Sequence, residues 1–438
     1  MYINWIPELR PNQIRLPKSV AIPHSVVLHF GSWKKKMSVI ICDHLSMDSI
    51  GLPEHLKTEI TIPDTLPYEM YVDGANLHLG PVIAFLIPTQ MLTSGVFNDY
   101  LKYFANYQTV KGLIYLCSVN GINPTDKTIE GFYYNPNADG SDAPWTKGIF
   151  PYPGAAYRRI WVGSRNRLYD DLIVHMKGKI FNPYFLNKWE LCKLLCSKPL
   201  IRDHLPVTKR VDNLQTLEKM LALYTSVYLK PANGSMGQGI MKVEKTPKGY
   251  LFINRYQEKT FFASKTKAWA YFRRIRKGRK YLIQQSAALT YQNKNVDFRV
   301  IMQKDGNQQW ACSGVIARYG EVGRFYTNDI SSISLGRDAL RTVFHFNDEE
   351  AAQKEEEIIS ICTKACQLID HKYGPFGDVG IDVTVDTNLK VWLLEINSLH
   401  QHTIPYYVKD DPQMYSRVLS RPFEYAKSLA GFTKEKIL

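Results

Sequence analysis

The sequence predicts a mixed α/β (α+β) fold with several domains, and three observations support this prediction. The segment 227–231 reads as a short strand of β-branched and aromatic residues, and a loop with three glycines in six residues and a second strand follow it. The segments 380–386 and 390–397 alternate around a turn, which predicts a β-hairpin. Strand and helix patterns alternate between residues 80 and 180. With 438 residues and 45% apolar content, the chain is long enough for two or three domains with real cores.

Residues 1–78 are expected to form a small β-rich domain without a catalytic constellation. Its predicted strands are 25–30, 37–42 and 68–72, and Asp73-Gly74 is a turn signal. Residues 79–180 are expected to form an α/β domain. Its predicted elements are strands at 81–87 and 113–119, a helix around 97–108, and a loop rich in Pro, Gly, Asn and Asp at 134–154.

Residues 181–430 are expected to form the third domain. Its first helix is predicted to begin within 182–188 and to run to about Ser197. A longer helix is predicted from Asp348 to about Tyr373, because Asn347 and Glu350 form a plausible cap pair and Gly374-Pro375 would end it. Its predicted buried stripe is Ile358, Ile361, Cys362, Ala365, Leu368 and Ile369.

The glycine-rich loop predicts an anion site. Glycine tolerates positive φ and has no Cβ, so the backbone N–H groups of such a loop can turn toward a phosphate. Lys230 would add a positive charge beside it. The spacing is neither that of a P-loop, which ends in Gly-Lys-Ser/Thr, nor the G-x-G-x-x-G that opens a dinucleotide-binding helix. A glycine-rich hairpin turn without a ligand is the alternative.

The C-terminal hairpin predicts two opposed carboxylates. Period-2 alternation gives each strand a polar face, with Asp382, Thr384 and Asp386 on the first and Leu393, Glu395 and Asn397 on the second. A loop of two or four residues centred on the bond between 388 and 389 would set Asp382 opposite Glu395, with Cβ atoms roughly 5 Å apart. An odd-length loop would shift this register.

Facing carboxylates are unfavourable unless a cation lies between them. Asp382, Glu395 and the amide oxygen of Asn397 are hard oxygen donors, which suit Mg²⁺ held partly through nucleotide phosphates. A solvated polar face is the alternative, but Trp392 and Ile396 make the second strand too apolar for a plain surface element. The hairpin therefore predicts a magnesium site.

A phosphate-cradling hairpin upstream of a carboxylate hairpin resembles the ATP-grasp superfamily and, within it, the YheC/YheD-like ATP-grasp proteins, known as endospore coat-associated proteins. The likeness rests on the segments 228–235, 297–306, 377–382 and 392–398, and it spans about residues 180–425. It implies an ATP-grasp fold in which two α+β subdomains clasp the nucleotide, after an α/β domain and a small β-rich N-terminal domain.

The resemblance also implies the ATP contacts. Lys188 would lie against the α-phosphate, a hinge would hold adenine through its backbone, and Asp297 would meet the ribose hydroxyls. The implied nucleotide-binding residues are Lys188, Lys230, Asn233, Gly234, Ser235, Met236, Gly237, Gly239, Gln285, Ser286, Ala287 and Asp297. For Gln284 and Gln285, a polar pair on an edge strand is the alternative.

The implied reaction is that of an ADP-forming ligase. ATP would activate a carboxylate as an acylphosphate, and an amine, thiol or hydroxyl acceptor would capture it. One or two Mg²⁺ ions on Asp382, Glu395 and Asn397 would bridge the phosphates. Arg299 would serve the phosphate or acylphosphate side, and Arg318 would hold the substrate carboxylate by a bidentate fork, with surface salt bridging as its alternative. The rival functions are a coat-associated protein that binds nucleotide with little turnover, and a kinase of the same fold.

Two departures from the common ligase pattern concern the acceptor end of the site. Many ATP-grasp ligases carry an arginine two residues before the metal aspartate, and this chain has Gly380 there. A Pro-Gly turn commonly follows the metal asparagine, and this chain has the segment 398–402, which contains His400 and His402. These histidines would act in proton transfer or lie at the surface, and surface positions are the expectation.

The formal net charge of +14 is concentrated in one segment. Eight positive residues and no acid lie within 265–280: Lys265, Lys267, Arg273, Arg274, Arg276, Lys277, Arg279 and Lys280. Tyr271 and Phe272 interleave with them, which would suit single-stranded nucleic acid. A solvated helix face that lies over the nucleotide is commoner than a nucleic-acid site, so a nucleic-acid partner is disfavoured. An acidic polymer or peptide as partner is an interpretation between these two.

The sequence predicts a cytoplasmic protein, and the resemblance adds an association with the spore coat and its proteins. The N-terminus lacks a basic-then-apolar signal pattern, and apolar runs such as 81–87 are far shorter than the ~20 residues of a membrane span. The seven cysteines contain no metal-type C-x-x-C, and two i,i+4 pairs fall in apolar helical patterns. Core-facing thiols of this kind indicate a reducing compartment.

Overall fold

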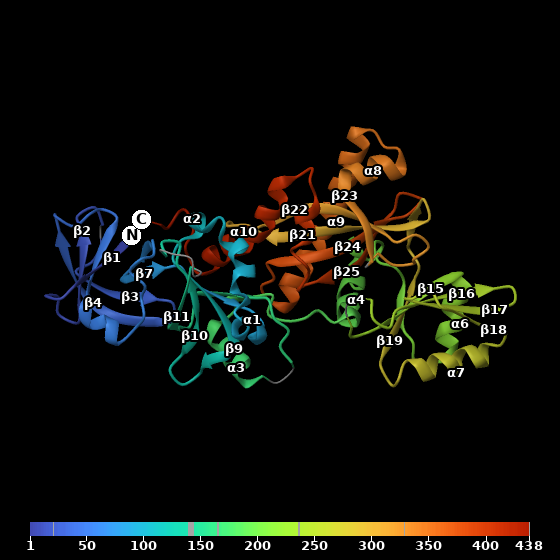
Figure 1. Cartoon of the computed structure of the whole chain (residues 1–438), viewed down its shortest axis with the longest axis horizontal. Helices are drawn as coiled ribbons and strands as arrows, with labels where there is room; N and C mark the ends of the chain where they lie inside the picture. Colours follow the sequence, from blue (N-terminus) through green and yellow to red (C-terminus); the bar gives the residue numbers. More distant parts are fainter. Residues whose placement is uncertain (21, 139–143, 164–165, 235–236, 328, 438) are drawn as a thin grey trace.

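The computed structural model describes residues 1–438 except 21, 139–143, 164–165, 235–236, 328 and 438. Four β-sheets follow one another along the long axis of the molecule, with the N-terminal sheet at one end and the sheet that contains β15–β19 at the other (Figure 1). No helix in the described part of the chain is long and apolar enough to cross a membrane.

The first sheet has the strand order β1-β5-β2-β4-β3-β7-β6. Its strands are β1 (Tyr2–Ile6), β2 (Gln13–Pro17), β3 (Ser25–Phe30), β4 (Trp33–Cys42), β5 (Ser49–Pro53), β6 (Glu69–Asp73) and β7 (Asn76–Gly80), with the 3-10 helix η1 (Glu54–Thr58) after β5. The three predicted strands correspond to β3, β4 and β6, and β6 and β7 pair around the predicted Asp73-Gly74 turn.

The second sheet has the order β11-β10-β9-β8-β12-β13. Its elements are β8 (Val82–Leu86), α1 (Thr89–Thr93), η2 (Val96–Phe104), α2 (Tyr107–Val110), β9 (Leu113–Asn123), β10 (Thr128–Tyr134), β11 (Trp145–Pro151), β12 (Ala155–Arg158), α3 (Arg167–Met176) and β13 (Ile180–Phe181). The prediction of one loop over 134–154 is wrong, because β11 lies within it. Its one glycine, Gly148, and its one proline, Pro151, are tolerated because β11 is an edge strand that pairs only with β10 within the described sheet.

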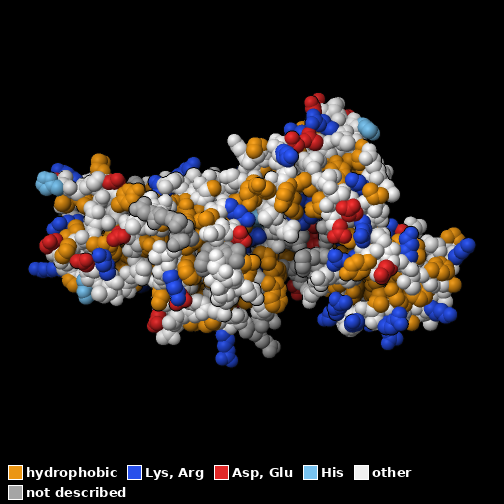
Figure 2. All heavy atoms as spheres, viewed as in Figure 1, with side chains coloured by type: hydrophobic (Ala, Val, Ile, Leu, Met, Phe, Trp, Pro, Cys, Tyr) orange, Lys and Arg blue, Asp and Glu red, His pale blue; other side chains and the backbone are white. Residues whose placement is uncertain are grey.

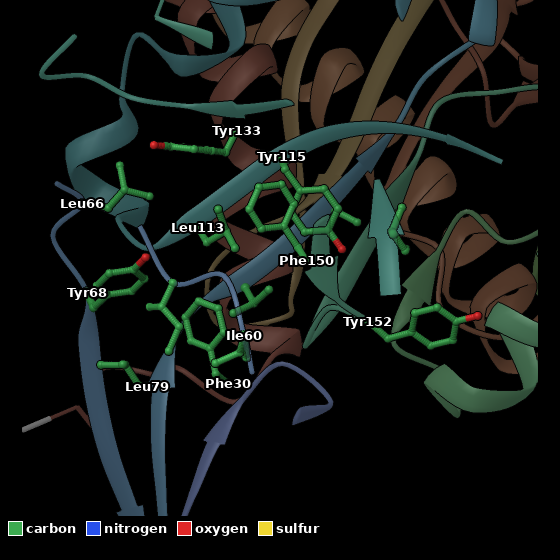
Figure 3. Close-up of a cluster of buried hydrophobic side chains, with 14 of the residues drawn as sticks. Phe30, Ile60, Leu66, Tyr68, Leu79, Leu113, Tyr115, Tyr133, Phe150 and Tyr152 are labelled. Atoms are coloured by element: carbon green, nitrogen blue, oxygen red, sulfur yellow. The ribbon is translucent and has the colours of Figure 1, made fainter. Parts of the chain in front are cut away.

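The first two sheets share one hydrophobic core (Figure 3). Phe30, Tyr68 and Leu79 from the first sheet and its connections lie in the same cluster as Leu113 and Phe150 from the second. The two sheets are therefore held together by apolar burial.

The third sheet has the order β14-β19-β15-β16-β17-β18, and α4 (Lys188–Cys196) and α5 (Pro199–Arg202) precede it. Its elements are β14 (Thr208–Arg210), α6 (Leu214–Leu223), β15 (Ser226–Pro231), β16 (Met241–Thr246), β17 (Gly249–Asn254), β18 (Lys259–Phe262), α7 (Lys265–Ile275) and β19 (Tyr281–Gln285). We call residues 208–285 the small lobe. Val227 and Leu229 of β15 pack with Leu217 of α6 and Phe272 of α7, so both helices cover one face of this sheet.

The fourth sheet has the order β23-β22-β21-β24-β25, with β20 on β21. Its elements are β20 (Leu289–Tyr291), β21 (Lys294–Lys304), β22 (Trp310–Gly320), β23 (Ile330–Leu335), α8 (Gly336–Phe344), α9 (Asp348–Tyr373), β24 (Asp378–Val385), β25 (Val391–Asn397), η3 (Ile404–Tyr407) and α10 (Pro412–Leu429). The capping box of Asn347 and Glu350 is confirmed, and α9 buries its predicted stripe against this sheet, with Leu368 only partly buried.

Helix α10 connects the fourth sheet to the second (Figure 1). Val418 packs with Ile301 of β21, whereas Phe423 packs with Phe85 and Tyr157 of the second sheet. Helix α9 therefore covers one face of the fourth sheet. Helix α10 covers one end of the opposite face, and the remaining end of that face is open for a site.

Candidate active site

Lys188 meets a carboxylate between the small lobe and the fourth sheet. It is the first residue of α4, which is fixed by the Asn187 side chain as N-cap. Its Nζ lies 2.6 Å from Oε1 of Glu395 and donates to the carbonyl oxygen of Gly234 at 2.8 Å. The helix start, the glycine-rich loop and β25 therefore converge on one ammonium group.

Lys230 approaches the same place from β15. Its Nζ donates to Oε1 of Gln284 at 2.5 Å. Burial and the neighbouring Lys188 lower the pKa of Lys230, while Glu395 and Asp382 oppose that shift. The structure thus brings together both predicted lysines and both predicted metal carboxylates.

The glycine-rich loop joins β15 and β16, which pair antiparallel as predicted. Gly237 and Gly239 have φ of +69° and +76°, in the left-handed region that favours glycine. A Cβ on Gly239 would also lie 2.9 Å from the hydroxyl of Tyr281. Asn233 accepts a hydrogen bond from the side chain of Asn187, which ties the loop to the start of α4. The predicted residues Ser235 and Met236 lie outside the described residues.

The predicted pairing of Asp382 with Glu395 is confirmed, but a β-bulge produces it. The loop has an odd length, so Val383 pairs with Leu393, one position away from the predicted register. The extra residue Leu394 then restores the register at Glu395. The prediction that Leu393 shares a face with Glu395 is wrong for the same reason, since Leu393 is buried in the core under α9.

Asp382 is held by both predicted arginines. Arg299 of β21 donates through Nε to Oδ1 of Asp382 at 2.7 Å, and Nη2 of Arg318 lies 3.0 Å from the same oxygen. Burial would raise the pKa of Asp382, but the two guanidinium groups outweigh it and hold the pKa at about 2. The surface alternative for Arg318 is wrong, because this side chain is buried.

Asp297 fixes Arg318 and does not face an open ribose site. Its two oxygens accept from Nε and Nη2 of Arg318, both at 2.7 Å, and Oδ2 also accepts from the hydroxyl of Thr327. The residue is buried. This geometry gives Asp297 a different task from the predicted ribose contact: it orients Arg318 by a bidentate pair.

An apolar cleft lies beside the lysines. Its lining includes Leu186, Leu191, Leu205, Pro206, Thr208, Leu282, Gln284, Leu393 and Ile396, together with Lys188, Lys230 and Glu395. The predicted hinge residues Gln285, Ser286 and Ala287 are not among the lining residues, and the backbone N–H of Gln285 already donates to the carbonyl oxygen of Val207 at 2.9 Å. The apolar walls of this cleft could not be predicted from the sequence, because they come from α4, the 205–208 segment and two sheets that are far apart in the chain.

The donor set fits Mg²⁺. Glu395 and Asn397 lie on β25 and are partly exposed, and Glu395 is paired with Asp382 of the neighbouring strand β24. All three side chains offer oxygen atoms. The Nζ of Lys188 lies 2.6 Å from Oε1 of Glu395, so this carboxylate already has one positive partner. Asp382, Glu395 and Asn397 would therefore hold the ion.

Asp378 is the centre of a buried polar cluster that the sequence did not predict. Its carboxylate accepts hydrogen bonds from Tyr157 at 2.5 Å and from Gln303 at 2.9 Å, and Nη1 of Arg159 lies 3.2 Å from Oδ2. Asn182 donates to its carbonyl oxygen. The sequence did contain one signal for Asp378, because period-2 alternation places Asp378, Gly380 and Asp382 on the same face of the strand. Its partners could not be found, since Tyr157 and Arg159 come from the second sheet and its flank.

The expectation that His400 and His402 lie at the surface is wrong. Both are buried, and their Nε2 atoms lie 2.9 and 3.0 Å from Asp378. Burial lowers the pKa of both rings, and for His402 the pKa falls to about 3. The ligand atoms of Asp378, His400 and His402 lie within 4.8 Å of one another, but Arg159 already supplies the cation there, since its Nη1 is 3.0 Å from Nε2 of His402. We therefore assign no metal to this cluster.

Comparison with known proteins identifies the class and then the family. The family model described as "YheC/D like ATP-grasp" matches residues 177–429. The chain therefore has an ATP-grasp fold in this region, and it belongs to the YheC/D-like ATP-grasp family. The match spans α4, the small lobe, the fourth sheet and α10, which together hold the site described above.

The chain is also similar to two named relatives and, at a low TM-score, to solved structures. The chain is similar to the endospore coat-associated protein YheD of Bacillus subtilis (strain 168), at 26% identity over 98% of this chain and 96% of YheD. It is also similar to the endospore coat-associated protein YheC of the same organism, at 23% identity over 58% of this chain and 72% of YheC. A solved structure of the ATP-grasp ligase PsnB complexed with minimal precursor aligns with a TM-score of 0.45 and 12% identity over 80% of this chain and 99% of that chain.

Proposed function

We propose that this chain is an ATP- and Mg²⁺-dependent ligase that activates a carboxylate as an acylphosphate and transfers the acyl group to an amine, forming a C–N bond. The observation that supports this most is the convergence of Lys188 and Lys230 on Glu395, opposite Asp382, with two buried arginines behind Asp382. Each of these carboxylates is paired with a lysine or an arginine, so the site combines oxygen donors for an ion with positive groups for phosphates.

The apolar cleft would take the adenine ring. Leu205 and Leu282 offer apolar walls for the base. Lys188 and Lys230 lie at the Glu395 end of the cleft, where they would contact the phosphates. The positive φ of Gly237 and Gly239 lets the loop backbone turn toward an anion above them.

Mg²⁺ bound by Asp382, Glu395 and Asn397 would neutralise phosphate charge in the transfer. Asp382 is ionised at every working pH because its pKa is about 2. Arg299 and Arg318 keep fixed positive charge on the opposite side of Asp382, where the substrate carboxylate and the transferring phosphoryl group would meet.

The chemistry divides into two steps. A carboxylate oxygen of the substrate attacks the γ-phosphorus, the bond to the β-phosphate oxygen breaks, and ADP leaves. The amine then attacks the acyl carbon, the C–O bond of the acylphosphate breaks, and phosphate leaves with the electron pair. The amine loses one proton to solvent or phosphate. The protein holds the reactants in line and neutralises charge.

The test is ADP and phosphate release measured against a panel of amino acids, short peptides and acidic oligomers, with hydroxylamine added as a trap. An acylphosphate yields an acyl hydroxamate with hydroxylamine, so we expect ATP-dependent hydroxamate with the correct carboxylate. The Glu395→Gln variant is the matched control and should yield none. A kinase would release ADP and a stable phosphorylated product without free phosphate, and that outcome would replace the ligase proposal.

A second candidate is a coat-associated protein that binds ATP with little turnover. It is favoured by the names of YheD and YheC, which describe association with the endospore coat. ATP binding without ADP release across the whole panel would favour it. In either case, spore-coat proteins are the partners that the relatives suggest.

A further inference from the structure

Nearly all of the net charge of the chain lies in the small lobe. Residues 208–285 contain seventeen lysines and arginines against four acids, which is +13 of the total of +14. The remainder of the chain is almost neutral. ATP binding needs only a few positive groups at the phosphates, so the nucleotide site does not account for this excess.

The charges on α7 and at its C-terminal end face away from the nucleotide site. Side chains alternate across β15, so Val227 and Leu229 pack under α6 and α7 whereas Lys230 points to the site. Helix α7 therefore covers the far face of this sheet. Figure 2 shows lysines and arginines gathered along the side of this lobe where Figure 1 places α7. We call the exposed residues Lys267, Arg273, Arg274 and Lys277 the basic face.

The basic face lacks acidic partners within the described residues. The nearby Lys265 lies 3.6 Å from Glu218, but the structure gives Lys267, Arg273, Arg274 and Lys277 no ion pair in the described part of the chain. Acidic side chains of the described residues therefore leave these four charges unpaired, and this surface would attract a polyanion.

The aromatic residues of α7 exclude two classes of polyanion. Phe272 is buried, and Tyr271 packs on Phe252 and Phe262 at 5.3 and 4.9 Å between ring centroids. The third aromatic residue of α7, Trp269, is partly buried and packs on Phe272 at 5.5 Å between ring centroids. All three rings are therefore engaged with other rings, which disfavours the single-strand alternative predicted from the interleaving of Tyr271 and Phe272. The same burial leaves no apolar helix face to insert into a bilayer.

A free strand edge beside the basic face indicates a polypeptide. β18 is the last strand of its sheet and pairs only with β17 among the described strands, so its outer edge is available for hydrogen bonding. It contacts α7 and carries Lys259 and the half-exposed Phe261. An extended peptide can add to such an edge through its backbone, whereas a nucleic acid or a lipid cannot.

We propose that α7 and the outer edge of β18 form a docking surface for an acidic polypeptide segment in an extended conformation. The carboxylates of the segment lie against the basic face, and its backbone pairs with β18. This surface goes beyond the proposed ligase function and does not depend on it, because no residue of the basic face belongs to the nucleotide site. It would hold an acidic protein partner next to a lobe that binds ATP.

The experiment measures binding of a fluorescein-labelled oligoglutamate peptide to the full chain by anisotropy at several salt concentrations. One variant combines Arg273→Glu, Arg274→Glu and Lys277→Glu. Its control combines Lys34→Glu, Lys36→Glu and Lys434→Glu, three exposed lysines of the N-terminal sheet and the C-terminal tail, and so changes the net charge equally. We expect affinity to fall with salt, to drop about tenfold or more in the α7 variant, and to stay within about twofold in the control. Hydrogen exchange should show the β18 amides becoming protected on binding.

Three results would overturn the proposal. Equal weakening in the control set would mean that net charge alone attracts the peptide. Unprotected β18 amides would remove the strand-edge contact. Tighter binding of an oligonucleotide of equal charge, or of phosphatidylserine vesicles, through the same α7 residues would name another partner class. An unchanged ATP-dependent thermal shift in the α7 variant shows that it is folded.

Discussion

Gly380 lies directly against the imidazole ring of His400. A Cβ added to Gly380 would lie 2.7 Å from both Cβ and Cγ of His400 and 3.1 Å from Nδ1 of its ring, too close for any side chain. Asp378, two residues earlier on the same strand face, holds Nε2 of His400 at 2.9 Å. The two departures from the common ligase pattern are therefore one feature, because the glycine makes the space that the histidine fills.

Gly380→Ala should destabilise the chain by about 1–3 kcal/mol, as overpacking of a closed core does. Urea unfolding measures the loss. A double variant with His400→Gly supplies the control, because removal of both the Cβ and the ring relieves the clash, and the second substitution should then cost less than it does alone. Additive losses in the double variant would show that the two residues do not share this space.

Acid should destabilise the protein through His402. Burial first, and Arg159 second, lower the pKa of His402 from its ordinary 6.5 to about 3. Between these values the unfolded chain binds a proton at this residue and the folded chain does not, so the free energy of unfolding falls as pH is lowered. Asp378, whose pKa is also depressed, adds to the loss at lower pH. Urea unfolding at stepped pH should show a flatter profile for His402→Gln, and a parallel profile would count against this assignment.

The sequence predicted the local features well because they depend on neighbouring residues. The bounds of β3, the cap of α9 and the antiparallel hairpin around the glycine-rich loop all follow from spacing and turn residues. The pairing of Asp382 with Glu395 was also predicted, although the odd loop and the Leu394 bulge that together produce it were not. Two shifts of one residue cancelled, and period-2 reasoning detects neither.

The sequence could not predict features that depend on distant segments. Three partners of Asp378, namely Gln303, Arg159 and Tyr157, lie 75, 219 and 221 positions away along the chain, so no spacing rule joins them. The expectation for Arg318 was a substrate contact or a surface position; the side chain is buried, and Asp297 holds it by a bidentate pair across two strands. The sequence alone does not distinguish charged residues that pair with one another from charged residues that bind a ligand.

Lys230→Ala should largely remove the rise in melting temperature that ATP with Mg²⁺ produces. A ligand that binds only the folded state stabilises it by mass action, and this lysine supplies a charge at the proposed phosphate position. Differential scanning fluorimetry measures the shift. Lys245→Ala, an exposed position on the adjacent strand β16, is the matched control and should respond like the parent. An undiminished shift in Lys230→Ala would contradict the proposed phosphate contact.

Glu395→Gln should reduce turnover by roughly 100-fold or more, since several kcal/mol of charge stabilisation in phosphoryl transfer depend on the bound metal. The change is nearly isosteric, so the fold should persist. Coupled assay of ADP release gives the rate, and titration with Mg²⁺ should show weaker dependence on the ion. Glu355→Gln on α9, which removes an ion pair with Arg337 away from the site, should leave the rate unchanged. A fully active Glu395→Gln would remove the metal role of this carboxylate.

Asp297→Asn should separate the two tasks considered for this residue. If Asp297 orients Arg318, the substitution breaks a buried ion pair at a cost of about 3–5 kcal/mol and raises KM for the carboxylate substrate, while ATP affinity stays near that of the parent. If it bound the ribose, ATP affinity would fall and the preference for ATP over 2′-deoxy-ATP would disappear. Arg318→Lys, which keeps the charge but loses the fork, should reproduce the first pattern without changing nucleotide preference. Isothermal titration with both nucleotides, together with urea unfolding of each variant, distinguishes the outcomes, and the buried geometry of the pair favours the first.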